Sequence, residues 1–130
     1  MTAFATKPLP DEFDVLAPDG SEVRILLALA GGSMAHFRLP AGKVSRAVRH
    51  LTVAEIWYVL DGSGEMWRAQ DGHAGVVPVA AGVCLTLPVG TAFQFRASAD
   101  GALTAVAITM PPWPGPEEAV FVEGAWAATA

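Results

Sequence analysis

Residues 42–64 read GKVSRAVRHLTVAEIWYVLDGSG, and the segment IWYVL within them is the most apolar strand candidate in the chain. A run of β-branched and aromatic residues that ends in Asp-Gly is typical of a strand entering a tight turn. Before this run, Val48-Arg49-His50 fits a short strand in which Val48 and His50 share a face, because side chains alternate along a strand. The stretch therefore predicts two strands, and it contains two side chains suited to metal binding or proton transfer, His50 and Glu55.

Turns that contain glycine or proline punctuate the rest of the chain at short intervals. The segments between them are predicted as strands: residues 13–16, 22–30, 34–39, 65–69, 76–79, 83–87, 92–97 and 102–110. Short strands separated by turn residues about every 8–12 positions indicate an all-β sandwich or barrel. Pro78 cannot donate a hydrogen bond to a neighbouring strand, so the strand that contains it is expected at a sheet edge.

The spacing in the quoted stretch resembles the first motif of the cupins. That motif reads glycine, five residues, His, one residue, His, three or four residues, Glu, six residues, Gly. Gly42, His50, Glu55 and Gly62 occupy these positions, and Val48 stands at the first His position. The resemblance therefore extends to the two glycines and to two of the three ligand positions of this motif.

A second stretch, GVCLTLPVGTAFQFRA, resembles the second cupin motif, which reads glycine, five residues, Pro, one residue, Gly, two residues, His, three residues, Asn. Gly82, Pro88 and Gly90 match it, while Phe93 stands at the His position and Ala97 at the Asn position. The scaffold residues of both motifs are thus present, and two of the four usual metal ligands are replaced.

The resemblance implies one domain, with a double-stranded β-helix (a jelly-roll barrel) over residues 21–110. Residues 1–20 are expected to form an N-terminal arm, and residues 111–130 a proline-rich C-terminal strap in which Trp113 anchors the chain to the barrel. A lid beside the mouth of a pocket is the alternative role for the strap. A chain of 130 residues is long enough for one domain with a sizeable core.

Composition restricts the partners. The hydrophobic fraction is 52% and the charged fraction 16%, which favours a compact fold over disorder. The net charge of −5 gives no electrostatic basis for binding nucleic acid or an anionic membrane. One cysteine fits a reducing compartment, and the longest apolar run, residues 25–30, is too short to span a bilayer. We expect a soluble, cytoplasmic protein.

The cupin resemblance implies that His50 and Glu55 point into the barrel. Two protein ligands make a poor transition-metal site, because structural zinc takes four and catalytic zinc three. His36, on a neighbouring strand candidate, is the possible third ligand. Without a metal, the same His–Glu pair suits general acid–base catalysis near neutral pH. The cofactor is therefore either absent or a divalent metal such as Zn, Fe, Mn or Ni.

Six other side chains are predicted to contact a ligand, because aromatic residues with a few polar groups are typical of small-molecule sites. They are Arg46, Trp57, Trp67, Phe93, Gln94 and Phe95. Phe93 is expected to fill the position of a metal-ligating histidine. Arg46 is a possible anchor for a substrate carboxylate or carbonyl.

Three functions remain open. The leading one is the binding of a small, partly apolar or aromatic organic molecule in the barrel, with acid–base chemistry of the isomerase, epimerase, cyclase or lyase type. The alternatives are a metal-dependent oxygenase or isomerase and a non-catalytic ligand-sensing module. Residues 56–60 are apolar on both faces, so the outer face of this strand is expected to pack on another sheet, in this chain or in a homodimer.

Overall fold

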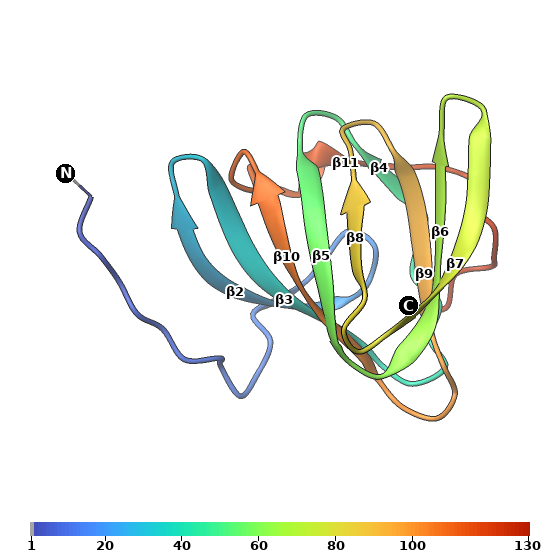
Figure 1. The fold of residues 1–130 in the computed structure, drawn as a ribbon, viewed down its shortest axis with the longest axis horizontal. Helices are drawn as coiled ribbons and strands as arrows, with labels where there is room; N and C mark the ends of the chain where they lie inside the picture. The colour runs from blue at the N-terminus through green and yellow to red at the C-terminus, as the bar shows by residue number, and fades with distance from the viewer. Residues whose placement is uncertain (1) are drawn as a thin grey trace.

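The computed structural model describes residues 2–130, and it consists of two antiparallel β-sheets that face each other (Figure 1). The strands are β1 Val15–Leu16, β2 Glu22–Leu29, β3 Gly32–Leu39, β4 Val48–His50, β5 Ala54–Asp61, β6 Ser63–Gln70, β7 His73–Ala80, β8 Cys84–Leu87, β9 Ala92–Ala97, β10 Leu103–Met110 and β11 Ala119–Phe121. One sheet has the order β1-β2-β3-β10-β5-β8 and the other the order β11-β4-β9-β6-β7. The predicted all-β class is confirmed.

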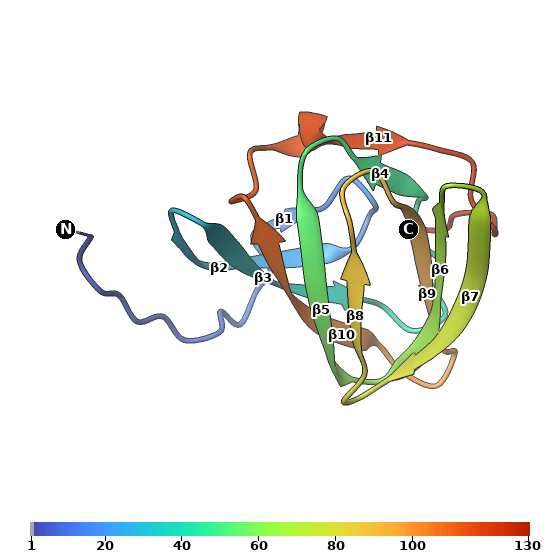
Figure 2. The same cartoon turned by 45° about the horizontal axis from the view of Figure 1, so that its top comes forward.

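The chain passes repeatedly between the two sheets, so strands far apart in sequence become neighbours. Strand β10 pairs with both β3 and β5, and β9 pairs with both β4 and β6. The sheets curve around a common core, as Figure 2 shows from a second side. This arrangement is the predicted jelly roll, and β7, the strand that contains Pro78, lies at a sheet edge as expected.

Alternation along β5 determines which side chains reach the core. Trp57 and Val59 are buried between the sheets, whereas Ile56, Tyr58 and Leu60 are 41%, 48% and 43% exposed. The outer face of this strand is therefore apolar and uncovered by residues 2–130. The prediction that another sheet of the same chain covers it is wrong.

The turn between β5 and β6 shows why a glycine stands in the first motif. Gly62 has φ +81°, a conformation that residues with a side chain rarely adopt. A Cβ at this position would also lie 2.1 Å from the carbonyl oxygen of Ala102. Only glycine allows the chain to turn here and pass so close to the start of β10.

The two ends of the chain join the sheets in different ways. Residues 2–9 are exposed and extend away from the sheets (Figure 1), and the predicted strand at 13–16 is shortened to β1. The C-terminal segment contains regular structure despite its prolines: a 3-10 turn, Pro116–Glu118, leads into β11, which pairs with β4. Proline suits the first position of such a turn, where its missing N–H is not needed. No helix within residues 2–130 has the length and apolar composition to cross a bilayer.

Candidate functional site

A cavity of about 360 Å³ lies where β1, β2 and β3 of one sheet approach the ends of β4 and β5 and the C-terminal segment. Most of its lining is apolar. The side chains with polar groups are Asp19, Ser33, His50, Glu55, Trp57, Thr109 and Trp113. No lysine or arginine of the described chain lines it. The cavity therefore offers acidic, imidazole and hydroxyl groups but no fixed positive charge.

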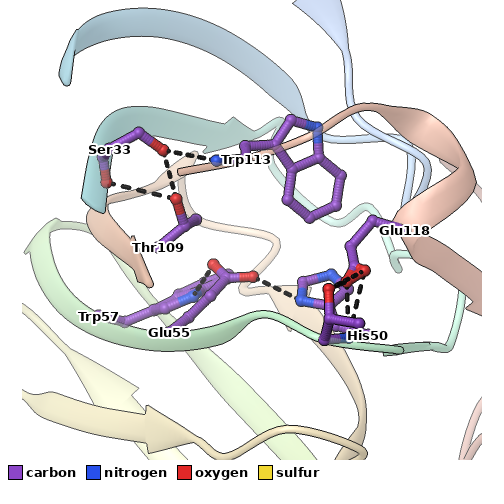
Figure 3. Close-up of polar contacts among 8 residues, drawn as sticks. Ser33, His50, Glu55, Trp57, Thr109, Trp113 and Glu118 are labelled. Atoms are coloured by element: carbon purple, nitrogen blue, oxygen red, sulfur yellow. Dashed lines mark hydrogen bonds and ion pairs between the residues drawn. The ribbon is translucent and has the colours of Figure 1, made fainter. Parts of the chain in front are cut away.

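His50 and Glu55 form a buried pair at this cavity (Figure 3). His50 ends β4 and Glu55 lies on β5, so a short loop crossing from one sheet to the other brings them together. The His50 Nδ1 atom lies 2.9 Å from Glu55 Oε2, and the Trp57 Nε1–H donates to Glu55 Oε1 at 3.0 Å. A carboxylate at Nδ1 holds the proton on that nitrogen in the neutral imidazole, which leaves Nε2 as an acceptor.

The second ring nitrogen of His50 is free to act. Nε2 has no hydrogen-bond partner in residues 2–130. It is also not one of the unpartnered side-chain atoms that are sealed from solvent there, which are His36 Nδ1 and Thr91 Oγ1. His50 Nε2 is therefore not sealed from solvent, and His50 is one of the residues that line the cavity. The imidazole packs at an angle against Phe93, with ring centroids 5.3 Å apart, and against Trp113 at 5.0 Å.

Trp113 is fixed over the cavity by its backbone. Its N–H donates to Ser33 Oγ at 3.0 Å, and Ser33 Oγ also shares a hydrogen bond with Thr109 Oγ1 (Figure 3). Pro112 and Pro116 line the cavity on either side of Trp113. The C-terminal segment therefore forms part of the cavity wall, in addition to the anchoring that the sequence predicted for Trp113.

Glu118 supports the loop that joins His50 to Glu55. Its carboxylate accepts hydrogen bonds from the backbone N–H of Thr52, at 2.6 Å, and from the Thr52 hydroxyl. Burial works to raise the pKa of Glu118, but the hydrogen bonds from Thr52, together with the nearby His50 and the Val53 backbone, hold this pKa below its ordinary value. Sequence reasoning did not find this contact, because it joins residues 66 positions apart.

Asp19 is a second acidic group at the cavity that sequence reasoning missed. It is 5% exposed, and its Oδ1 accepts from the Ser21 N–H at 2.9 Å and the Ser21 hydroxyl at 2.6 Å. Burial raises the pKa of Asp19, the Ser21 hydrogen bonds lower it, and Glu55 raises it further, so that the pKa lies above its ordinary value. In the sequence, an Asp within Ala-Pro-Asp-Gly has the composition of a solvated turn.

The structure brings only part of the predicted ligand-contacting set to the cavity. Trp57 and Phe93 line it, and Phe95 lies behind them, with its ring 5.0 Å from that of Trp57. Trp67 and Gln94 are register partners on the outward face of their sheet, since Met66, Phe93 and Phe95 take the inward positions.

Arg46 also lies outside the cavity. It is exposed, and its guanidinium carbon lies 5.4 Å from the centre of the Phe121 ring. The residue precedes β4, and only its backbone is directed toward the Asp19 turn, to which its N–H donates at 2.8 Å. The cavity therefore lacks the basic anchor expected for a substrate carboxylate.

The donor set does not fit a transition metal. Val48 and Phe93 are register partners and put hydrocarbon at two of the ligand positions in the motifs. His36 lies on the face of β3 opposite to Ala35 and Phe37, which line the cavity. Within residues 2–130 no three His, Cys, Asp or Glu side chains are arranged to hold a metal ion. His50 and Glu55 alone fall short of the three or four ligands that such ions take from proteins.

Comparisons with known proteins add to the geometry. No protein-family model and no curated protein sequence matches the chain. Among solved structures, the capsular polysaccharide assembling protein CapF from Staphylococcus aureus has a TM-score of 0.73 at 16% identity, over 92% of this chain and 35% of CapF. This chain thus corresponds to about a third of CapF.

Two other solved structures are closer in length to this chain. A Klebsiella pneumoniae protein with a double-stranded β-helix domain has a TM-score of 0.65 at 16% identity, over 95% of this chain and 99% of that one. KdgF from a Halomonas species has a TM-score of 0.65 at 14% identity, over 79% and 93%. Both the strand order and these neighbours show that the chain has the double-stranded β-helix fold.

Proposed function

We propose that the protein binds a small, partly apolar or aromatic organic molecule in the cavity and transfers protons on it without a metal. The observation that carries this proposal is the state of His50: Glu55 fixes one ring nitrogen, and the other retains access to the cavity. This arrangement is typical of a general base whose tautomer is set by a carboxylate. The reaction class is an isomerisation, epimerisation, cyclisation or elimination.

The walls of the cavity support a flat or partly apolar ligand. Phe37 and Trp57 stack with ring centroids 5.5 Å apart and planes 4° from parallel, and Trp113 stands beside His50. A volume of about 360 Å³ is at the small end of ligand pockets. CapF has been solved with 3-isopropenyl-tropolone, a conjugated ring with adjacent oxygens, as its inhibitor. We extend that ligand chemistry to this chain as part of the proposal.

The roles of the paired residues follow from their contacts. His50 Nε2 accepts a proton from a carbon next to a carbonyl group, and Glu55 stabilises the imidazolium that forms. The Trp57 N–H holds the remaining carboxylate oxygen, so that the carboxylate stays turned toward His50. The proton then returns to the product at a different position. Catalysis of this kind contributes about 10²–10⁴-fold in rate.

The test is hydrogen exchange in D2O. Wild-type protein and His50→Gln are incubated with a panel of small ketones and hydroxy ketones, and the loss of C–H signals next to carbonyl groups is followed by proton NMR. Wild type should exchange at least one compound about 100-fold faster than His50→Gln. Binding without any exchange would overturn the catalytic part of the proposal and favour the ligand-sensing alternative.

The metal-dependent alternative is tested separately. Protein purified without a metal-affinity tag is analysed for its metal content and melted with and without a chelator. A near-stoichiometric metal together with a melting temperature that falls with the chelator would refute the metal-free proposal.

We also propose a homodimer that works in the cytoplasm and binds no nucleic acid. The uncovered apolar side chains of β5, Ile56, Tyr58 and Leu60, are the residues expected at the dimer contact. Light scattering after size exclusion should give twice the monomer mass of 13.5 kDa. The substitution Tyr58→Glu should shift the mass to that of a monomer, since a buried charge at the contact is costly.

A further inference from the structure

The turn that holds Asp19 is built into the cavity wall. The Gly20 N–H donates to the Ala17 carbonyl oxygen at 2.9 Å, and the Arg46 N–H donates to the Asp19 carbonyl oxygen at 2.8 Å. Ala130 packs against Gly20, where an added Cβ would lie 2.8 Å from the carbonyl carbon of Ala130. The turn is thus fixed on three sides, and the carboxyl group of Asp19 is set among the residues that line the cavity.

Only one of the two carboxyl oxygens of Asp19 accepts hydrogen bonds within residues 2–130. Oδ1 takes both hydrogen bonds from Ser21. Oδ2 has no partner in residues 2–130 and is not among the sealed unpartnered atoms there, and Asp19 is one of the residues that line the cavity. A turn-stabilising aspartate needs one oxygen and works equally well in water. The burial of the other oxygen at the cavity is therefore unexplained by the turn.

The surroundings of Asp19 differ from those of Glu55. Both oxygens of Glu55 have a partner: Oε2 lies 2.9 Å from His50 Nδ1, and Oε1 accepts from the Trp57 N–H. Asp19 has only Ser21, and the lining contains no lysine or arginine to compensate a charge. The titratable groups that act on Asp19 are Glu55 and His50, and burial favours its neutral form. Two carboxyl groups in one cavity with such different partners are suited to opposite acid–base roles.

We propose that Asp19 is a catalytic acid, whose Oδ2 gives a proton to the carbonyl oxygen of the substrate while His50 Nε2 removes a proton from the adjacent carbon. This inference rests on the proposed function. The C–H bond breaks and its electron pair forms a C=C bond to the carbonyl carbon. The carbonyl oxygen takes the Asp19 proton, which gives an enol, an Asp19 carboxylate and a His50 imidazolium.

The reverse transfers complete the cycle on an α-hydroxy carbonyl compound. His50 returns its proton to the former carbonyl carbon, and the Asp19 carboxylate takes the proton of the neighbouring hydroxyl group, which becomes the new carbonyl. Both residues regain their starting protonation, and no other reactant is needed. Because no lysine or arginine of the described chain lines the cavity, the substrate class is an uncharged α-hydroxy aldehyde or α-hydroxy ketone.

The experiment compares Asp19→Asn with wild type, His50→Gln and the control Asp100→Asn. The asparagine keeps the shape and an oxygen for Ser21 but has no carboxylic proton, and Asp100 is an exposed aspartate that also contacts a serine. The probes are glyceraldehyde, dihydroxyacetone and larger uncharged α-hydroxy ketones in D2O. Asp19→Asn should slow exchange about 100-fold and remove one limb of the pH–rate profile, with Asp100→Asn unchanged.

The possible outcomes are separable. If Asp19→Asn keeps the wild-type rate while His50→Gln loses it, the role of Asp19 is refuted and the proposed function stands. If wild type exchanges none of the probes, both are refuted. A carbon-13 NMR titration gives a second test that needs no substrate: the carboxyl signal that disappears in Asp19→Asn should titrate above the range of the other aspartates. If that signal titrates among the others, the proposal is overturned.

Discussion

Two buried polar clusters lie on opposite faces of β9, and they use their hydrogen-bonding capacity differently. On the outward face, Gln94 Nε2 donates to the carbonyl oxygens of Ser45 and Trp126, both at 2.8 Å. Its Oε1 accepts from the N–H groups of Ala125, at 2.9 Å, and Trp126, at 3.0 Å. Every donor and acceptor of this amide is occupied, so the group has nothing left to offer a ligand.

On the inward side, the cavity groups are only half occupied. His50 has one nitrogen on Glu55 and Asp19 has one oxygen on Ser21, and each keeps a second atom open to the cavity. Leaving a buried polar atom without a partner costs about 1–3 kcal/mol, so its presence needs a reason. The difference indicates that the Gln94 cluster holds the C-terminal segment, whereas the cavity cluster keeps the unpartnered atoms that the proposed function requires.

The largest stability effect should come from Gln94→Ala. The substitution removes four hydrogen bonds and leaves backbone groups of the C-terminal segment without partners. We expect the free energy of unfolding to fall by about 2–4 kcal/mol, measured by urea denaturation. Gln70→Ala, at an exposed glutamine of β6, should change it by less than about 0.5 kcal/mol. Equal effects of the two substitutions would remove the distinction between the clusters.

The next effect tests the tightness of the same cluster. A Cβ at Gly124 would lie 2.3 Å from Gln94 Oε1 and 2.6 Å from the Ala47 Cβ, so Gly124→Ala should destabilise by about 1–3 kcal/mol. Gly101→Ala has open space around its Cβ and should be neutral or slightly stabilising. If Gly124→Ala is as mild as Gly101→Ala in thermal unfolding, the C-terminal segment is less firmly held than its contacts indicate.

Sequence reasoning succeeds here where local chemistry determines the outcome. The strands, their turns, the edge position of Pro78 and the shared face of Val48 and His50 follow from alternation and turn residues, and the structure has them. The approach of His50 to Glu55 came from the motif spacing, and the two side chains do meet. These features depend on residues within a few positions of each other.

The features that sequence reasoning missed depend on contacts across the fold. Asp19 enters the cavity because its turn packs beside Arg46, and Glu118 reaches Thr52 because β11 pairs with β4. Gln94 was predicted at the cavity although it alternates with Phe93, which was placed there too. For Gln94, strict alternation would have given the correct outward facing. For Asp19 and Glu118 no local pattern carries the information.

The substitution Glu55→Gln should have a smaller effect on stability and should change the tautomer of His50. Glu55→Gln keeps an oxygen for the Trp57 N–H but can present an amide N–H to His50 Nδ1, which then becomes the acceptor. The His50 proton should move to Nε2, so that the atom facing the cavity changes from acceptor to donor. Nitrogen-15 NMR of the imidazole should report this exchange of tautomers, with a stability loss of about 1 kcal/mol. An unchanged tautomer would show that Glu55 does not set it.

The smallest effects concern pH, and the two buried carboxyl groups should act in opposite directions. Burial raises the pKa of Asp19 in the folded state. From about pH 4 upward the folded protein therefore keeps a proton that the unfolded chain releases. The free energy of unfolding falls over this range until the pH passes the raised pKa. Burial raises the pKa of Glu118, but the Thr52 hydrogen bonds, together with His50 and the Val53 backbone, lower it below its ordinary value. The contribution of Glu118 is therefore present above about pH 4 and is lost as pH falls through the lowered value. In urea denaturation from pH 3 to 8, Asp19→Asn should therefore gain on wild type as pH rises, whereas Glu118→Gln should approach wild type as pH falls. If the free energies of unfolding of wild type and Asp19→Asn change in parallel with pH, the pKa of Asp19 is the same in the folded and unfolded states. Asp19 would then behave as an ordinary turn aspartate.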